Sequence, residues 1–280
     1  MMKIKAVFFD IDGTLLNDHG SILPSTKRAI ALARAQGIYC GIATGRGLPN
    51  VKQVISSLPM DMFVTYNGQY VIHHDHVIYA HPFDVTTLKE IVQYAHEHKR
   101  QALFGSGDKM MGSLTMRIGQ SKLFSHLLNH LPKGEVFHFG SQLLKKLSPN
   151  QKALRYQQLS ILQEPIYQCV MLCSNRELVE MQQFLPNCDF QRSNPYSVDI
   201  VPKGGSKIKG IKEFADYLGI EMSEIMAFGD HLNDLEMLAG VGIGVAMGNA
   251  QEIVKQKADF VTLSNNHDGI YYAMKQFEVI

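Results

Sequence analysis

Two acids near the start of the chain stand where they could take part in chemistry. Asp10 and Asp12 follow the apolar run 7–9, and Gly13 comes directly after them. An unbroken apolar run is typical of a strand buried on both faces of a parallel sheet. Ionised acids at the end of such a strand are costly unless a bound group uses or neutralises them. We therefore expect a ligand here, because ligands of open α/β sheets bind beyond the carboxyl ends of the strands.

Polar residues follow other predicted strands in the same way. Thr44 follows the apolar run 38–43, and Asp230 follows the run 225–228. Lys207 starts a predicted helix shortly after another strand. The carboxyl ends of parallel strands meet at one edge of a sheet, so we expect these side chains to gather near the first two acids.

The combined residue types favour phosphoryl transfer. With Asp234, the set holds four carboxylates, which repel one another and need a cation to stay ionised. Oxygen ligands without Cys or His favour Mg²⁺. One carboxylate could attack phosphorus, and a second acid two residues later would project to the same face of an extended strand, near the leaving group. A lysine ammonium and a threonine hydroxyl suit the charge on the phosphoryl oxygens.

Strand and helix patterns alternate at both ends of the chain. The first part predicts strands near 7–9, 38–43 and 62–65, with helices over 24–37 and 48–58. The alternation returns from Val198, with strands near 198–201, 225–228, 243–246 and 260–261 and helices to 218, to 238, over 250–256 and over 268–277. This alternation predicts an α/β fold with a doubly wound parallel sheet.

The middle of the chain breaks that alternation. A hairpin is expected over 69–80, with its tip at His73–His76. Helices are then expected over 85–98, 122–131 and 176–185, and strands near 102–104, 114–116 and 167–172. The segment is large enough for a separate α+β domain. We therefore predict a core of residues 1–82 and 195–280, interrupted by an inserted domain of residues 83–194.

The composition is that of an ordinary globular protein. The net charge is +1, from 27 basic and 26 acidic residues, so bulk charge indicates neither a nucleic-acid nor a membrane partner. No apolar run approaches the roughly 18 residues of a membrane span. The chain enters its first strand at once, and its four cysteines show no disulfide pattern, so we expect a cytoplasmic protein with reduced cysteines. Nothing in the pattern indicates an oligomeric state.

Four stretches together resemble the motifs of the haloacid dehalogenase (HAD) superfamily. They are Asp10-Ile11-Asp12-Gly13-Thr14, Thr44-Gly45-Arg46, Lys207, and Gly229-Asp230-His231-Leu232-Asn233-Asp234. Asn67-Gly68 and the insertion after the third strand resemble the Cof-type subfamily, which carries an α/β cap domain. The resemblance spans the chain and implies a Rossmann-like core with an inserted cap. His231 departs from the family, which more often has glycine there.

The residue chemistry and the resemblance assign the same roles. Asp10 is the expected nucleophile and a Mg²⁺ ligand. Asp12 is the expected general acid and later base, with its backbone carbonyl as a second ligand, and Asp230 is the third. Thr44 and Lys207 are expected to hold the phosphoryl group, although Thr44 could instead cap a helix.

Several further residues have a weaker claim. Asp234 and Asn233 are expected either near the metal or orienting the lysine. Gly45, Arg46 and Asn67 are expected to contact phosphate or substrate, with a purely structural role open for the last two. Lys203 competes with Lys207 for the phosphate, and the latter is preferred because the glycines precede it as in the family.

The expected function is that of a Mg²⁺-dependent phosphatase. It would hydrolyse a small phosphorylated metabolite, such as a sugar phosphate or a phosphorylated cofactor, through an aspartyl phosphate. A phosphotransferase or mutase is the first alternative, but only residues 15–23 separate the first motif from the next helix, where mutases usually carry a cap. A signalling receiver domain and a regulatory protein with a dormant site are alternatives of another class. Specificity is expected from the cap, with 105–111 and 192–196 as candidate segments.

Overall fold

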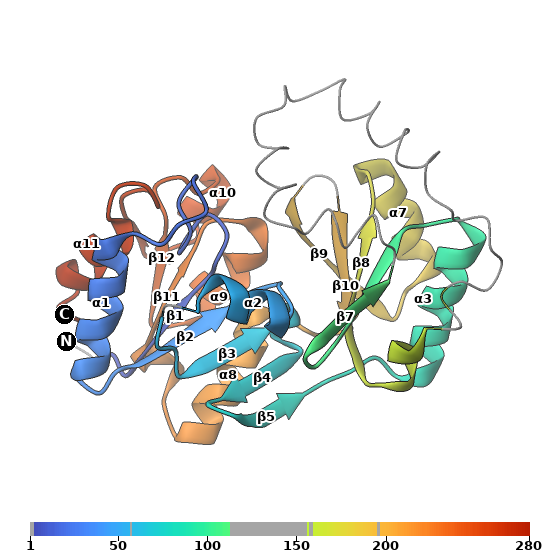
Figure 1. Ribbon diagram of the computed structural model, residues 1–280. Helices are drawn as coiled ribbons and strands as arrows, with labels where there is room; N and C mark the ends of the chain where they lie inside the picture. The colour runs from blue at the N-terminus through green and yellow to red at the C-terminus, as the bar shows by residue number, and fades with distance from the viewer. Residues whose placement is uncertain (1–2, 57, 113–155, 157–158, 195–196) are drawn as a thin grey trace.

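The protein is built from two β-sheets, each covered by helices (Figure 1). The computed structural model describes residues 3–56, 58–112, 156, 159–194 and 197–280. Within these ranges, the larger sheet has eight strands and the smaller has five. This arrangement confirms the predicted α/β class.

The larger sheet is formed by both ends of the chain. Its first half holds β1 (Ala6–Phe9), α1 (Pro24–Ala35), β2 (Tyr39–Ala43), α2 (Leu48–Val54), β3 (Met62–Thr65), β4 (Tyr70–His73) and β5 (His76–Ala80). Its second half holds α8 (Lys207–Leu218), β11 (Ile225–Gly229), α9 (Leu235–Gly240), β12 (Ile243–Ala246), α10 (Glu252–Lys255), β13 (Phe260–Val261) and α11 (Gly269–Gln276).

The strand order of this sheet is β13-β12-β11-β1-β2-β3-β4-β5. All pairs from β13 to β3 are parallel, and β3 to β5 continue as antiparallel neighbours. The chain winds outward in one direction from β1 and in the other from β11. The crevice of such a sheet lies where the winding reverses, at the carboxyl ends of these two strands.

The first strand shows why the sheet is buried on both sides. Val7 and Phe9 pack into one apolar cluster together with residues of α1, α2 and α11. Phe8 points to the opposite face, where α8, α9 and α10 contribute, and meets the Phe214 ring edge-on at 5.6 Å. Alternate residues of a strand face opposite sides, so each face can bury its own apolar set. The strand therefore has no exposed face, and its polar groups can only lie at its ends.

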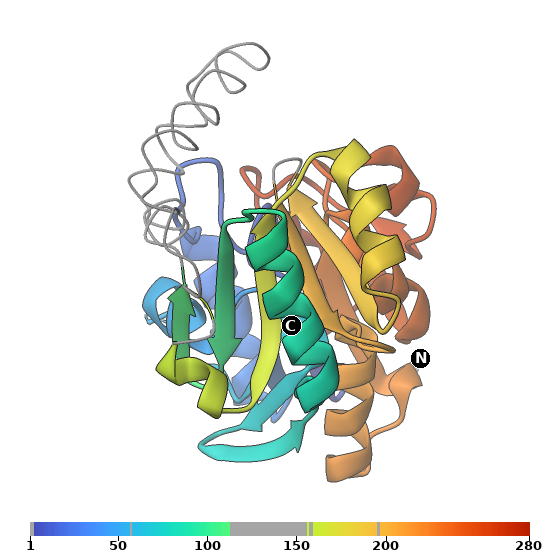
Figure 2. The same cartoon turned by 90° about the vertical axis from the view of Figure 1, so that its right-hand side faces the viewer.

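The smaller sheet comes from the middle of the chain. Its elements are α3 (Val85–Glu97), β6 (Ala102–Ser106), β7 (Lys109–Gly112), β8 (Ile166–Leu172), α7 (Asn175–Phe184), β9 (Cys188–Asn194) and β10 (Ser197–Pro202). The order is β7-β6-β8-β10-β9, and all pairs are antiparallel. Helices α3 and α7 cover one face (Figure 2). The other face therefore remains for contacts with the larger sheet.

One predicted strand lies in a different sheet from the one expected. The strand near Val198–Val201 exists as β10, but it pairs with β8 and β9 of the smaller sheet. The expectation that it returns the chain to the larger sheet was wrong. Its apolar residues pack against the helices of the smaller sheet, and strand β9, which we did not predict, completes its pairing. On this basis we propose that the second core segment begins after Pro202.

Most other elements lie within a few residues of their predicted ranges, including the hairpin at His73–His76. The strand expected near 114–116 and the helix over 122–131 lie outside the described residues. All four cysteines are free and buried, as expected. Among the described helices, none has the length and apolar character that crossing a bilayer requires.

One of the contacts between the two sheets is made by a buried tyrosine. Tyr66, directly after β3, is fully buried and donates its hydroxyl hydrogen to the Ser106 carbonyl at 2.9 Å. Its ring stacks on Tyr167 of β8, with 5.9 Å between the ring centroids. Gly105 is required beside it, because an added Cβ there would lie 2.4 Å from the tyrosine ring. These contacts hold the smaller sheet over the carboxyl ends of β2 and β3.

Candidate active site

A buried ammonium group holds two of the predicted acids together. Lys207, the first residue of α8, donates from Nζ to Asp10 Oδ1 at 2.6 Å and to Asp234 Oδ1 at 2.7 Å. All three side chains are buried. Burial disfavours the charged ammonium, but the attraction of the two carboxylates outweighs this and raises the pKa of Lys207 above its ordinary value. The lysine is therefore a permanent positive charge at the base of the site.

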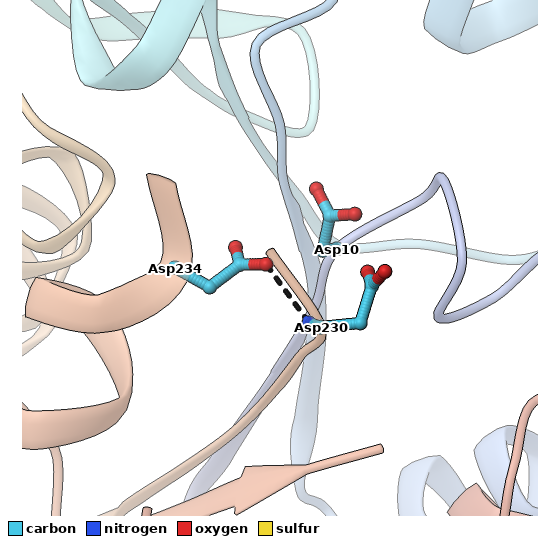
Figure 3. Close-up of side chains that lie close together, drawn as sticks. All are labelled: Asp10, Asp230 and Asp234. Carbon is cyan, nitrogen blue, oxygen red and sulfur yellow. Dashed lines mark hydrogen bonds between the residues drawn. The ribbon is translucent and has the colours of Figure 1, made fainter. Parts of the chain in front are cut away.

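The acids meet because of the sheet topology. Asp10 follows β1, and Asp230 follows β11, the parallel neighbour of β1. Asp234 lies in the short turn before α9. Figure 3 shows the three carboxyl groups converging on one region. The expectation that strand-end acids gather at one sheet edge is thus met for these residues.

Both carboxylate oxygens of Asp234 are already occupied. Oδ1 accepts the lysine ammonium, and Oδ2 accepts the backbone N–H groups of Asp230 and His231, each at 3.0 Å. A carboxylate with three donors has little capacity left for a metal ion. The sequence left two roles open for Asp234, as a metal ligand or as a residue that orients Lys207. This geometry favours the second role.

The acid cluster can hold a metal ion. Carboxylate oxygens from Asp10, Asp230 and Asp234 lie within 4.8 Å of one another. Within the described part of the chain, Asp10 and Asp230 each accept a side-chain hydrogen bond on one oxygen only, so these two are the acids that can bind the ion. Burial, reinforced by the neighbouring acids, raises the pKa of Asp10 well above its usual range despite the lysine. Burial and the nearby Asp234 carboxylate also raise the pKa of Asp230 to about 7. A bound cation would lower the pKa values of both acids, because it favours their ionised forms.

The Asp230 carboxylate is positioned by the turn after β1. Thr14 donates its hydroxyl hydrogen to Asp230 Oδ1 at 3.1 Å. Gly13 has a φ of +79°, and an added Cβ would lie 2.2 Å from Asp230 Oδ2. Both the left-handed backbone and the space beside the acid therefore require glycine at this position.

The second acid of the first motif does not join the cluster. Asp12 instead forms a bidentate ion pair with Arg46, with Nε at 2.7 Å from Oδ2 and a terminal nitrogen at 2.6 Å from Oδ1. Its side chain is more than half exposed. Arg46, which we expected near the substrate, thus holds the proposed acid at the mouth of the site. A fork-shaped guanidinium suits a carboxylate in this geometry.

Thr44 directly follows β2, is buried, and lines the same cavity as Asp10. Its Oγ1 accepts the backbone N–H of Arg46 at 3.1 Å, so its hydroxyl hydrogen can still donate. The alternative helix-capping role is absent, because Gly47 occupies the cap position of α2. Lys203, the alternative to Lys207 for binding the phosphate, lies at an exposed position. It donates instead to the Pro186 carbonyl.

These side chains line a cavity of about 340 Å³ between the two sheets. The larger sheet contributes Asp10, Asp12, Gly13, Thr44, Gly45, Arg46, Gly47, Asn50, Asp230, His231 and Asn233. The smaller sheet contributes Met110, Gln168, Val170, Ser197 and Asp199. Of the two candidate specificity segments, 105–111 thus reaches the cavity through Met110. Residues 195 and 196 of the other lie outside the described part of the chain.

The sequence analysis missed four polar residues of this cavity, namely Asn50, Gln168, Ser197 and Asp199. Gln168 Nε2 donates to the Gly45 carbonyl at 3.1 Å. Asn67 Nδ2 donates to Gln168 Oε1 at 3.3 Å and to Asp199 Oδ2 at 3.2 Å. Asn67 therefore bridges the sheets and is itself buried rather than exposed to the cavity, while Asn233 Nδ2 approaches its amide oxygen at 3.5 Å. The acid in the apolar strand 198–201 was the signal that could have revealed this network.

Comparisons with known proteins identify the fold and its relatives. A family model described as haloacid dehalogenase-like hydrolase matches residues 7–274. A putative phosphatase YkrA of Bacillus subtilis is 34% identical over 279 residues, which cover all of both chains. The pyridoxal phosphate phosphatase YbhA of Escherichia coli is 29% identical, over 96% of this chain and 97% of its own. The solved structure of the HAD subclass IIB sugar phosphatase BT4131 matches with a TM-score of 0.78 at 30% identity, over 99% of this chain and all of that one.

The contact between Gly13 and Asp230 predicts a specific effect on metal binding. Gly13→Ala should weaken the binding of a divalent metal ion by about tenfold or more, because the new Cβ displaces an acid of the cluster. Isothermal titration calorimetry measures the affinity. Gly20→Ala is the matched control, since Gly20 also has a positive φ but has nothing within 4 Å of an added Cβ. Equal affinities in the two variants would contradict the assigned position of Asp230.

Proposed function

The chain belongs to the haloacid dehalogenase-like hydrolase family, and on that premise we propose that it is a Mg²⁺-dependent phosphatase acting through an aspartyl phosphate at Asp10. The observation that carries the proposal is the position of Asp10 in the cavity, with one oxygen bound to Lys207. The family, with its phosphatase relatives, supports hydrolysis of a phosphoric monoester on a small molecule. The metal, the intermediate and the residue roles are our proposals.

In this mechanism Asp10 is the nucleophile. Lys207 fixes its carboxylate through Oδ1, so the other oxygen is left to attack phosphorus. The ammonium has a third hydrogen, which can bind a phosphoryl oxygen as negative charge develops there. The Thr44 hydroxyl can do the same from the end of the neighbouring strand. Buried groups that are already in place need no reorganisation during the reaction.

The residues that would hold Mg²⁺ are Asp10 and Asp230, with the backbone carbonyl of Asp12. The donors are all oxygen, which suits Mg²⁺. When bound, the ion would neutralise negative charge on the nucleophile and on the phosphoryl group. Asp234 would remain outside this set because Lys207 and two backbone N–H groups occupy it. It would orient both the lysine and the Asp230 loop.

Asp12 is proposed as the acid and then the base. The ion pair with Arg46 holds the Asp12 carboxylate beside the cavity, where it can accept a proton from the attacking water in the second step. In the first step Asp12 must carry a proton to the leaving oxygen. The incoming phosphoryl group is itself an anion beside Arg46, and competition for the guanidinium would free Asp12 to take up a proton from water and deliver it to the leaving oxygen.

The substrate is proposed to be a small phosphorylated metabolite. A cavity of about 340 Å³ under a sheet of the same chain suits a small molecule rather than a protein. The relatives named for pyridoxal phosphate and for sugar phosphates support this class. Water as the acceptor distinguishes this function from a phosphotransferase, which would release little phosphate without an added alcohol.

Replacing the nucleophile tests the mechanism directly. Asp10→Asn should lower kcat by at least about 1,000-fold, since the amide cannot attack phosphorus. Phosphate release from p-nitrophenyl phosphate is the measurement, and EDTA should abolish it in the unaltered protein until Mg²⁺ is restored. Asp75→Asn, at the exposed hairpin tip, is the control and should retain full activity. Asp10→Asn within tenfold of the unaltered protein would exclude Asp10 as nucleophile.

The proposed acid predicts a dependence on the leaving group. Asp12→Asn should lower kcat/KM for alkyl phosphates by about 100-fold or more, because an alkoxide needs a proton to depart. The loss for p-nitrophenyl phosphate should be much smaller, since p-nitrophenolate departs without one. Comparing the two esters within the same variant cancels any general effect on folding. Equal losses for both would contradict the acid role.

A further inference from the structure

We propose that Asp199 selects the alcohol part of the substrate, admitting uncharged hydroxyl-bearing alcohols and rejecting alcohols with a second negative charge. This inference rests on the proposed phosphatase function and concerns the half of the cavity that the proposed chemistry does not use. It assigns a specificity role to an acid of the smaller sheet.

The period of two along β10 directs this acid into the cavity. Val198 and Ile200 pack under the helices of the smaller sheet, so Asp199 between them faces the opposite side. A Cβ added to Gly45 would lie 2.9 Å from Asp199 Oδ2. Gly45 directly follows Thr44, which is proposed to bind the phosphoryl group. Asp199 therefore lies beside the proposed phosphoryl site, where the first atoms of the alcohol part of the substrate would be.

The Asp199 carboxylate is fixed on one side and available on the other. Oδ2 accepts a hydrogen bond from Asn67, whose amide also binds Gln168. Gln168 in turn is held by the Gly45 carbonyl. Within the described ranges, Oδ1 of Asp199 accepts no hydrogen bond. An oriented acceptor with a free oxygen, 8% exposed and facing a cavity, suits a hydroxyl donor of a ligand.

The described cavity offers no free positive charge to a second anion. Arg46 binds Asp12 through two hydrogen bonds, and in the proposed mechanism the phosphoryl group competes for it, so neither arrangement leaves it for a second anion. Lys207 lies below the cavity and is shared by two carboxylates. A carboxylate or second phosphate on the alcohol would thus face Asp199 in a partly buried site where the described residues supply no counter-charge, and like charges repel strongly there.

Two matched ester pairs test this inference. Glycerol 3-phosphate is compared with 3-phosphoglycerate, and glucose 6-phosphate with 6-phosphogluconate, each by phosphate release with Mg²⁺. The assay is run at about pH 8.5, above the pKa of about 7 that burial gives Asp199. The unaltered protein should favour the uncharged member of each pair by about tenfold or more in kcat/KM. Asp199→Asn should bring that ratio close to one.

The ratio of kcat/KM between the two esters, measured in one variant, separates substrate selection from an effect on folding. A merely structural role would lower kcat/KM for both esters equally. Glu180→Gln removes an acid from the exposed part of α7, which covers the opposite face of the same sheet, and should leave the ratio unchanged. An unaltered protein that hydrolyses both members equally, or an unchanged ratio in Asp199→Asn, would overturn the inference. Phosphate release from none of these esters or from p-nitrophenyl phosphate would instead contradict the proposed function and this inference with it.

Discussion

The buried contact of one ammonium with two carboxylates is the constraint on which the site depends. Lys207 joins Asp10 to Asp234, and Asp234 in turn binds the backbone that carries Asp230. Removing one partner of a buried ion cluster typically costs about 3–5 kcal/mol, because the other charges are left uncompensated. The same charges that make the cluster costly also surround Asp10, the proposed nucleophile. The turn geometry at Gly13 and the packing of β1 are needed to bring them together.

The smaller sheet adds a second polar layer to this charged base. Asn67, in the left-handed region with a φ of 51°, turns its amide toward Gln168 and Asp199. Asparagine is among the few residues that adopt this backbone conformation readily. Asn67, the second residue after β3, thus joins the sheet that carries the proposed phosphoryl site to the strand that carries Asp199. The chemistry and the proposed selectivity are carried by different sheets that meet at Asn67.

Sequence alone predicts the residues with proposed chemical roles better than it predicts the side chains that they contact. Strand-end residues such as Asp10 and Thr44 are predictable because a parallel sheet places all its carboxyl ends together. The ion pair of Asp12 with Arg46 and the contacts of Asn67 depend on side-chain directions, which no local pattern specifies. Val198–Val201 was placed in the wrong sheet because an apolar strand carries no sign of its neighbours, and Asp199 was overlooked with it. The pairing partner of a strand is a long-range property.

The central claim is that Asp10 forms a bond to phosphorus. The most direct measurement is to stop the reaction in acid during turnover of a good substrate with Mg²⁺, reduce the protein with borohydride and sequence the peptides by mass spectrometry. An aspartyl phosphate is reduced to homoserine, whereas a free aspartate is not. We predict homoserine at position 10 and nowhere else, and none in protein treated identically without substrate. Rapid turnover with unmodified Asp10, or with homoserine at another aspartate, would contradict the account.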